Sequence, residues 1–165
     1  MKIVIIGGVA AGASAATKAR RTNENAQIIL FEQGEYVSFA NCGLPYYVGG
    51  TIPKRESLLV VREELFRKRY NIDVRVLSQI TKINRGRKTV TVFDKKNNTT
   101  YEESYDKLII ATGARPFVLP FLKDCENSYT CFTLYDVDKI KETLTNKLIK
   151  KSCSNWCWVY WYGTC

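Results

Sequence analysis

The stretch that decides the fold reads KIVIIGGVAAGASAATKARR and spans residues 2–21. Residues 2–7 are an apolar, β-branched run that ends in glycine, which is typical of a buried parallel strand entering a tight turn. The alanine-rich segment 10–21 ends in basic residues, which favour a helix C-terminus, and a second apolar run, AQIILFE, covers residues 26–32. This order predicts a βαβ unit with a right-handed crossover. The small residues expected to let the helix pack closely on the sheet are Ala10, Ala13 and Ala16.

The glycine turn between the first strand and the helix has the position of a dinucleotide-binding loop. Gly7 allows a tight turn, and Gly12 allows close packing of the helix against the sheet. The helix N-terminus then offers free N–H groups and a positive dipole end to a pyrophosphate. Val9 replaces the second glycine of the usual pattern, which weakens the motif taken alone. The candidate cofactor-binding residues of this turn are Gly7, Gly8, Val9, Ala10, Ala11 and Gly12.

Glu32 strengthens this interpretation, because it ends the second strand twenty residues after Gly12 (32 − 12). A carboxylate at that place can accept a hydrogen bond from a ribose 2′-hydroxyl. It therefore fits FAD or NAD and disfavours a 2′-phosphate. The alternative is a solvated glutamate beside a merely structural turn.

The rest of the chain continues an α/β pattern. Residues 33–53 are rich in Gly, Pro and aromatic residues and predict a loop. Residues 57–69 have a helical pattern, with Ser57 as the predicted N-cap. Residues 106–111 predict a further strand of the parallel sheet, and residues 133–149 predict a short amphipathic helix.

An alternating pattern in the middle of the chain predicts a small antiparallel sheet. Residues 73–94 alternate apolar and polar side chains, with a turn at residues 84–87. Residues 95–101 continue this segment as a polar turn region. We therefore expect a small antiparallel β insertion in an otherwise parallel α/β fold.

Composition narrows the class of function. The chain has 25 Lys and Arg against 16 Asp and Glu and has no His, which gives a formal charge of +9. Without His, mechanisms that need a Ser-His or Cys-His pair or a His-bound metal are excluded. The basic balance favours an anionic partner. No apolar run reaches the length of about 20 residues needed to span a bilayer, and the scattered cysteines indicate a reducing cytoplasm.

Cys42 lies in the segment SFANCGLPYY, residues 38–47. It has no partner cysteine at C-x-x-C or C-x-x-x-x-C spacing, so a dithiol mechanism within this segment is excluded. A single thiolate could form a mixed disulfide with a small thiol, or a sulfenic acid after meeting a peroxide. A buried, inert cysteine is the alternative, and the residues alone leave both open.

Three segments together resemble one enzyme family over residues 1–149. They read IVIIGGVAAGASAATKARR, FEQGEYVSFANCGLPYYVGG and YDKLIIATGARP. The chain resembles the N-terminal part of the single-cysteine pyridine nucleotide-disulfide oxidoreductases, and most closely their CoA-disulfide reductase and NADH oxidase branch. That branch also tolerates an apolar residue where Val9 stands.

The resemblance implies a fold and a domain order. The fold would be α/β, a Rossmann-like FAD-binding domain of which residues 1–118 form the first lobe. Residues 119–151 would begin an NAD(P)H-binding domain. The longer parent enzyme would be a cytoplasmic homodimer with a small-molecule substrate, and we expect no nucleic-acid partner, no membrane contact and no metal site.

The resemblance also implies a reaction and its residues. FAD would accept electrons from NAD(P)H and pass them to the catalytic Cys42, held as a mixed disulfide with CoA or as a sulfenic acid. CoA disulfide, oxygen and peroxide all stay open as acceptors. The further cofactor-binding residues would be Ala111, Thr112 and Gly113. The substrate-binding residues would be Ser14, Lys18, Arg21, Ser38 and Asn41. Two of these are cations that can meet phosphates, although a solvated basic helix end is the alternative.

The last segment, residues 152–165, does not resemble the family. Trp has the single codon TGG, so a reading frame shifted by one base turns every Trp codon into a Gly codon. Trp156, Trp158 and Trp161 then become glycines in the spacing GxGxxG, and the shifted segment can read VVVIGVGFIGM. That reading is a buried strand followed by a dinucleotide-binding loop.

We therefore interpret residues 152–165 as a frameshifted, non-native tail. The alternative is a genuine tail rich in Trp and Cys, but its three cysteines lack zinc-ligand spacing and no His is present as a further ligand. On this interpretation the chain itself is an inactive fragment of a parent enzyme. The alternative function is binding of adenine nucleotides without catalysis.

Overall fold

The computed structural model describes residues 1–125 and 128–146 and divides the chain into two compact parts. The first part combines Met1–Ala40 with Arg55–Gly113, and the second combines Asn41–Lys54 with the chain from Ala114 onward. The predicted boundaries after residues 118 and 151 refer to the longer parent and stay predictions. The predicted tail lies outside the described residues.

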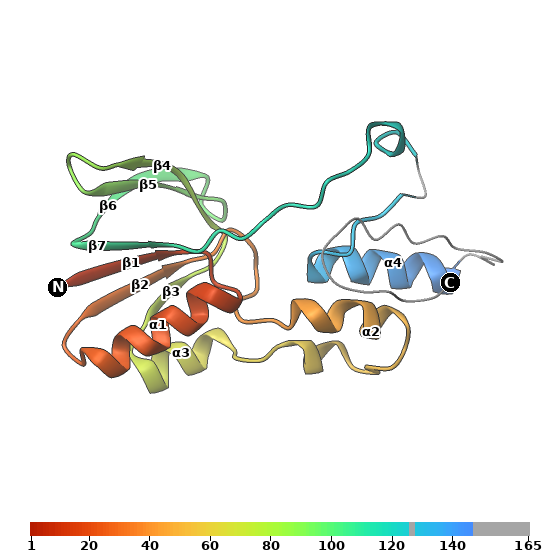
Figure 1. Ribbon diagram of the computed structural model, residues 1–165, viewed down its shortest axis with the longest axis horizontal. Helices are drawn as coiled ribbons and strands as arrows, with labels where there is room; N and C mark the ends of the chain where they lie inside the picture. Colours follow the sequence, from red (N-terminus) through yellow and green to blue (C-terminus); the bar gives the residue numbers. More distant parts are fainter. Residues whose placement is uncertain (126–127, 147–165) are drawn as a thin grey trace. The chain divides into compact units, whose positions relative to one another are not determined.

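A parallel sheet forms the centre of the first part, with the strand order β3-β2-β1-β7 (Figure 1). Its strands are β1 (Lys2–Ile6), β2 (Gln27–Phe31), β3 (Asp73–Arg75) and β7 (Lys107–Ile110). β1 lies between β2 and β7 and pairs with both in parallel. The prediction of a central parallel strand at residues 2–7 is therefore confirmed, and so is the α/β fold class.

Helices α1 (Ala10–Thr22) and α3 (Glu63–Tyr70) cover one face of this sheet (Figure 1). Gly12, Ala13 and Ala16 are the buried residues of α1, so small side chains do let this helix approach the sheet. Ala10, which we expected on the same side, is exposed, because it stands at the first position of the helix, beyond the packed face. The core on this side contains Ile3, Ile5, Ala13, Ala16, Ala26, Ile28, Leu30, Val37, Phe66, Ile72 and Val74.

A three-stranded antiparallel sheet covers the opposite face (Figure 1). It consists of β4 (Ser78–Asn84), β5 (Thr89–Asp94) and β6 (Thr99–Ser104). Its apolar side chains meet the parallel sheet in a second core of Val4, Ile6, Ile29, Phe31, Val90 and Val92. Because β1 and β2 are covered on both faces, their sequences are continuously apolar rather than alternating.

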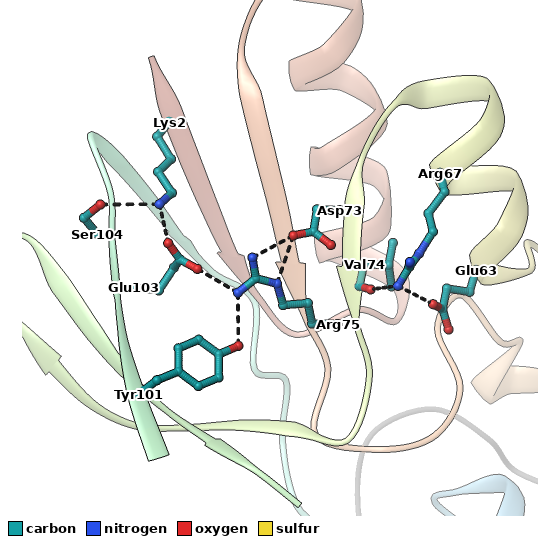
Figure 2. A network of polar contacts seen from close by, with 9 residues as sticks. All are labelled: Lys2, Glu63, Arg67, Asp73, Val74, Arg75, Tyr101, Glu103 and Ser104. Carbon is teal, nitrogen blue, oxygen red and sulfur yellow. Dashed lines mark hydrogen bonds and ion pairs between the residues drawn. The ribbon is translucent and has the colours of Figure 1, made fainter. Parts of the chain in front are cut away.

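A network of charged side chains joins the two sheets (Figure 2). Arg75 at the end of β3 donates to Glu103 Oε2 at 2.7 Å and to the Tyr101 hydroxyl at 3.0 Å, and both partners lie on β6. Lys2 donates to the other oxygen of Glu103, and Arg75 also pairs with Asp73. Burial opposes the charge of Arg75, but its hydrogen bonds outweigh burial and raise the pKa of the guanidinium.

Two strand predictions need correction. Residues 73–75 were expected in an antiparallel strand, but β3 pairs in parallel with β2. Leu77 has a φ of 53°, which turns the chain between β3 and β4 and lets them join different sheets. The polar turn predicted at residues 95–101 ends earlier, because β6 begins at Thr99 and pairs with β5.

The predicted helix over residues 57–69 also begins later than expected. Ser57 lies in the 3₁₀ turn η2 (Arg55–Leu58), and the N-cap of α3 is Arg62. Two acidic residues follow directly in the first turn, Glu63 and Glu64, where they interact favourably with the helix dipole.

The second part contains two helices that pack on each other. α2 (Leu44–Val48) follows the 3₁₀ turn η1 (Asn41–Gly43), so part of the segment predicted as a loop is helical. α4 (Leu134–Asn146) packs against α2, where the Lys141 ammonium lies 3.9 Å from the centre of the Tyr47 ring. Residues 147–149 of the predicted helix lie outside the described residues. Within residues 1–125 and 128–146, no helix is long and apolar enough to cross a membrane.

Candidate dinucleotide site and thiol segment

The turn after β1 brings two strand ends together at a glycine. Gly7 has a φ of 98° and donates its N–H to the carbonyl oxygen of Phe31 at 2.8 Å. A Cβ atom at this position would lie 2.2 Å from the carbonyl oxygen of Ala111, the residue that follows β7. A side chain at residue 7 would therefore be strained by its φ and would collide with backbone, so the turn requires glycine.

Gly12 in the first turn of α1 is also forced to be glycine. A Cβ atom there would lie 1.7 Å from the carbonyl oxygen of Gly7 and 3.4 Å from the Ile5 side chain. The constraint thus comes mainly from the backbone of the turn and only secondarily from the sheet, which refines the expected reason for this glycine.

Glu32 follows β2 directly and is 8% exposed. Its Oε2 accepts the Gly8 N–H at 2.7 Å, and its Oε1 accepts the Gly34 N–H at 2.8 Å. The predicted acid and the predicted glycine turn are therefore in direct contact. Each carboxylate oxygen has a further lone pair, so both can accept another hydrogen bond.

Contacts that the sequence did not predict hold Gly8 in place. A Cβ atom on Gly8 would lie 2.8 Å from Val37 Cγ1, and the Gly8 carbonyl accepts the Ser38 N–H at 2.9 Å. Gly34 is the second donor to Glu32. The contacts of Gly8 with Val37 and Ser38 join positions 29 and 30 residues apart (37 − 8 and 38 − 8), and the sequence carries no local signal for them.

The N-terminus of α1 suits a pyrophosphate. Val9 is its N-cap residue, no side chain caps the helix end, and no acidic residue stands in the first turn. The backbone N–H groups at the positive end of the helix are therefore free of a side-chain acceptor. The residues present thus fit the ADP part of a dinucleotide cofactor, because no side chain caps the helix end and no acidic residue in its first turn would repel a phosphate.

The other predicted cofactor-binding residues follow β7. Ala111 donates its N–H to the carbonyl oxygen of Ile6 at 2.8 Å, which ties this segment to the end of β1. Thr112 and Gly113 are exposed, and Gly113 has a φ of 66°. The structure therefore brings Ala111 to the glycine turn, as expected from the parallel pairing of β1 with β7.

The predicted substrate-binding residues fall in both parts. Ser14, Lys18 and Arg21 are exposed on α1 at spacings that place them on one helix face. Ser38 is half-buried in the first part, with a φ of 50°. Asn41 is exposed at the start of η1 in the second part.

Cys42 is a free, exposed thiol in η1. The next two residues, Gly43 and Leu44, are buried, and α2 begins at Leu44. The exposed thiol therefore directly precedes buried residues. Cys125 and Cys131 are also free and exposed. Although the residue is exposed, protein atoms around the Cys131 sulfur displace part of its water, and this desolvation together with the nearby Asp136 carboxylate raises the pKa of the thiol and lowers its thiolate fraction.

The parallel βαβ unit, its glycine turn and the acid after β2 together define a Rossmann-like dinucleotide-binding domain. A family model described as pyridine nucleotide-disulphide oxidoreductase matches residues 1–153. The chain therefore belongs to the pyridine nucleotide-disulphide oxidoreductase family, and the resemblance noted in the sequence is confirmed.

Known proteins similar to this chain are longer. Coenzyme A disulfide reductase of Staphylococcus aureus strain JH9 is 40% identical over 150 residues, which are 91% of this chain and 34% of that protein. Reduced Bacillus anthracis CoADR-RHD superposes with a TM-score of 0.84 at 48% identity, covering 87% of this chain and 26% of that one. The NADH-bound water-forming NADH oxidase of Lactobacillus brevis has a TM-score of 0.82 at 27% identity, covering 88% and 32%. The chain spans about a third of the length of the curated relatives it matches.

Proposed function

We propose that the first part of this chain binds the ADP half of FAD in a flavin-dependent NAD(P)H:disulfide oxidoreductase. The contact between Glu32 and the glycine turn carries this proposal, because the Gly8 N–H donates to Glu32 Oε2 at 2.7 Å. The contact supports the proposal because Glu32, as the acid for the ribose, would lie directly beside the loop for the pyrophosphate. FAD with NAD(P)H as cofactors agrees with membership of this family.

The residues of this part would divide the cofactor between them. The uncapped N-terminus of α1 would donate N–H groups to the pyrophosphate. The free lone pairs of Glu32 would accept hydrogen bonds from ribose hydroxyls. Ala111 to Gly113 would line the same region after β7. FAD, when bound, supplies two-electron exchange between NAD(P)H and a sulfur acceptor.

We assign the chemical step to Cys42. Its thiolate would attack one sulfur of a disulfide R–S–S–R, forming a Cys42–S–S–R bond, breaking the substrate bond and releasing R–S⁻. Two electrons from NAD(P)H, passed through the flavin, would then reduce the mixed disulfide and release the second thiolate. An exposed thiol that must stay reduced between turnovers fits the cytoplasmic location that we propose.

CoA disulfide is the favoured acceptor within this proposal. Lys18 and Arg21 are exposed cations on one face of α1, and they could meet the phosphates of an anionic substrate. The similarity to a coenzyme A disulfide reductase points to the same chemistry. The similarity to a water-forming NADH oxidase keeps oxygen or peroxide as the second candidate acceptor.

The proposal separates the 165-residue chain from the parent enzyme. The chain spans about a third of its relatives, so we propose that NAD(P)H oxidation and homodimer formation belong to the full-length enzyme. For this chain alone we expect binding of adenine nucleotides without turnover. Calorimetric titration of the purified chain with ADP and with FAD tests this expectation. Absence of any ADP or FAD binding by the folded chain would overturn the proposal.

A further inference from the structure

The peptide group between Gln33 and Gly34 is hydrogen-bonded at both ends. Its N–H, contributed by Gly34, donates to Glu32 Oε1 at 2.8 Å. Its carbonyl oxygen, contributed by Gln33, accepts a hydrogen bond from Lys95 Nζ at 3.0 Å. Since a peptide group is planar, one rigid unit connects the Lys95 ammonium to the Glu32 carboxylate.

Lys95 reaches this peptide from a well-fixed turn between β5 and β6. The Asp94 carboxylate accepts the Lys96 N–H at 2.8 Å and the Asn97 side-chain amide at 2.7 Å. The hydrogen bond from the Asn97 side chain is the main cause of the lowered pKa of Asp94. The Lys95 N–H donates to the Leu77 carbonyl at 2.9 Å. The backbone of Lys95 is therefore fixed by its own N–H bond to Leu77 and by the hydrogen bonds of Asp94, the residue before it.

Backbone bonds from the same sheet hold the flanks of the loop. The Ser78 N–H donates to the Glu32 carbonyl at 2.9 Å, and the Leu77 N–H donates to the Gly34 carbonyl at 3.0 Å. These bonds fix the peptide groups that precede and follow the Gln33–Gly34 peptide. The rotation of the Gln33–Gly34 peptide plane itself is restrained by its hydrogen bonds to Lys95 and Glu32.

We propose that Lys95 is a positioning residue for the adenine ribose and acts through the Gln33–Gly34 peptide on Glu32. This inference rests on the proposed function of the glycine turn and Glu32. A positive charge on the carbonyl side polarises the peptide and strengthens the N–H bond that it makes to the carboxylate. With Lys95 removed, the peptide plane loses its second anchor, and Glu32 loses its preferred orientation toward the ribose 2′-hydroxyl.

Lys96 provides a matched control for this role. It is exposed, stands next to Lys95 in the same turn, and its ammonium makes no hydrogen bond or ion pair within residues 1–125 and 128–146. Lys95→Met and Lys96→Met remove the same charge from nearly the same place. General attraction of an anionic nucleotide is therefore weakened equally in both variants.

The test measures calorimetric dissociation constants of the 165-residue chain for ADP and for 2′-deoxy-ADP. In Lys95→Met we expect ADP binding weakened about fivefold, as for a loosened hydrogen bond to a charged group. Binding of 2′-deoxy-ADP should stay within about twofold, because the hydroxyl that Glu32 orients is absent. Lys96→Met should leave both constants unchanged, and Lys95→Arg should keep most of the ADP affinity, since its guanidinium can donate to the same carbonyl. Thermal unfolding checks that all variants fold.

Three outcomes would overturn the positioning role. They are unchanged ADP affinity in Lys95→Met, an equal loss in Lys96→Met, and an equal loss for ADP and 2′-deoxy-ADP. The first would show no role, the second a general charge effect, and the third a structural effect without ribose specificity. If the unmodified chain binds neither ligand, the proposed function fails and this inference fails with it. Tight ADP binding that is insensitive to Lys95 would overturn this inference alone.

Discussion

Arg75 and Glu103 form an ion pair with a 2.7 Å contact that joins the last residue of β3 to β6 of the antiparallel sheet. Both side chains are mostly covered, at 29% and 15% exposed. The Arg75 carbonyl also accepts the Glu32 N–H at 2.9 Å, so the same residue contacts the backbone of the candidate ribose-binding acid. The contact between the two sheets is therefore connected to the site by a single residue.

The first prediction concerns the contribution of this ion pair to the stability of the fold, and how that contribution depends on pH. Burial opposes the charge of Glu103, but hydrogen bonds from Lys2 and Arg75 outweigh it and lower its pKa below the ordinary 4.5. A lowered folded-state pKa means that the unfolded chain binds the proton more readily, so the stabilisation is complete above about pH 4.5. It is lost as the pH falls through the depressed folded value.

Urea unfolding checks this by comparing the chain with its Glu103→Gln variant. At pH 7 we expect the variant to be less stable by about 1–2 kcal/mol, since a charged hydrogen-bond partner is replaced by a neutral one. The difference should shrink toward pH 3. Glu102→Gln, at an exposed position of the same strand, is the control with little expected effect. A stability difference that stayed constant from pH 7 to pH 3 would contradict the assignment.

The second prediction concerns Gly12. Gly12→Val should abolish binding of ADP and FAD, because its Cβ would lie 1.7 Å from the Gly7 carbonyl oxygen and displace the turn from the helix. Gly86→Val is the matched control, since a Cβ there meets its nearest atom at 3.7 Å. Nucleotide binding by Gly12→Val at the affinity of the control would refute the role of this turn.

The third prediction concerns Glu32. Glu32→Ala should weaken ADP binding by about 1–3 kcal/mol, because it removes a charged acceptor and leaves the Gly8 and Gly34 N–H groups without a partner. Glu32→Gln keeps the shape of the side chain and one acceptor oxygen, so its ADP affinity should lie between those of the unmodified chain and Glu32→Ala. Calorimetry with ADP measures this order, and equal affinities for all three proteins would show that the acid does not touch the ribose.

The fourth prediction concerns the thiols. In the full-length enzyme, Cys42→Ser should abolish disulfide reduction and leave the flavin bound, because the attacking sulfur is lost while the glycine turn and Glu32, which we propose hold FAD, are unchanged. Cys125→Ser and Cys131→Ser should keep the activity, and the raised pKa of Cys131 already disfavours its thiolate. The measurements are NAD(P)H oxidation with CoA disulfide and the visible flavin spectrum. Full activity of Cys42→Ser would assign the chemistry elsewhere.

The fifth prediction concerns residues 152–165, which lie outside the described residues. The family match ends at residue 153, close to where the tail begins. We propose that the gene, read one base later from the codons of Lys150 and Lys151, encodes a strand and a GxGxxG loop in place of the tail. Sequencing the gene through this region checks it. An early stop codon in the shifted frame would count against the frameshift.

The sequence was sufficient for the parts of the fold that local patterns determine. The strands at residues 2–7, 26–32 and 106–111 and the helix at 10–21 agree with the structure to about one residue at each end. Buried strands and small helical faces have a strong local signature, and so does a glycine turn. The acid expected after the second strand, Glu32, does contact this turn through the Gly8 N–H.

Features that depend on distant partners could not be predicted in this way. The alternation at residues 73–75 indicated a strand but carried no information about its partner, and the positive φ of Leu77 has no residue signature. The hydrogen bonds that connect Lys95 to Glu32 through the Gln33–Gly34 peptide join positions sixty-three residues apart (95 − 32). Because any residue can supply a peptide group, the sequence carries no signal for this connection.

The position of β1 in the middle of the sheet has a consequence for synthesis on the ribosome. Val4, fully buried, pairs with Leu108, so the first strand has one open edge until β7 has been made. At an elongation rate of about 5–20 residues per second, the intervening stretch takes roughly 5–20 s to synthesise. During that time an apolar strand with unpaired backbone groups is exposed to other nascent chains. Until β7 is made, the strand that anchors the glycine turn is therefore open to pairing with other chains along that edge.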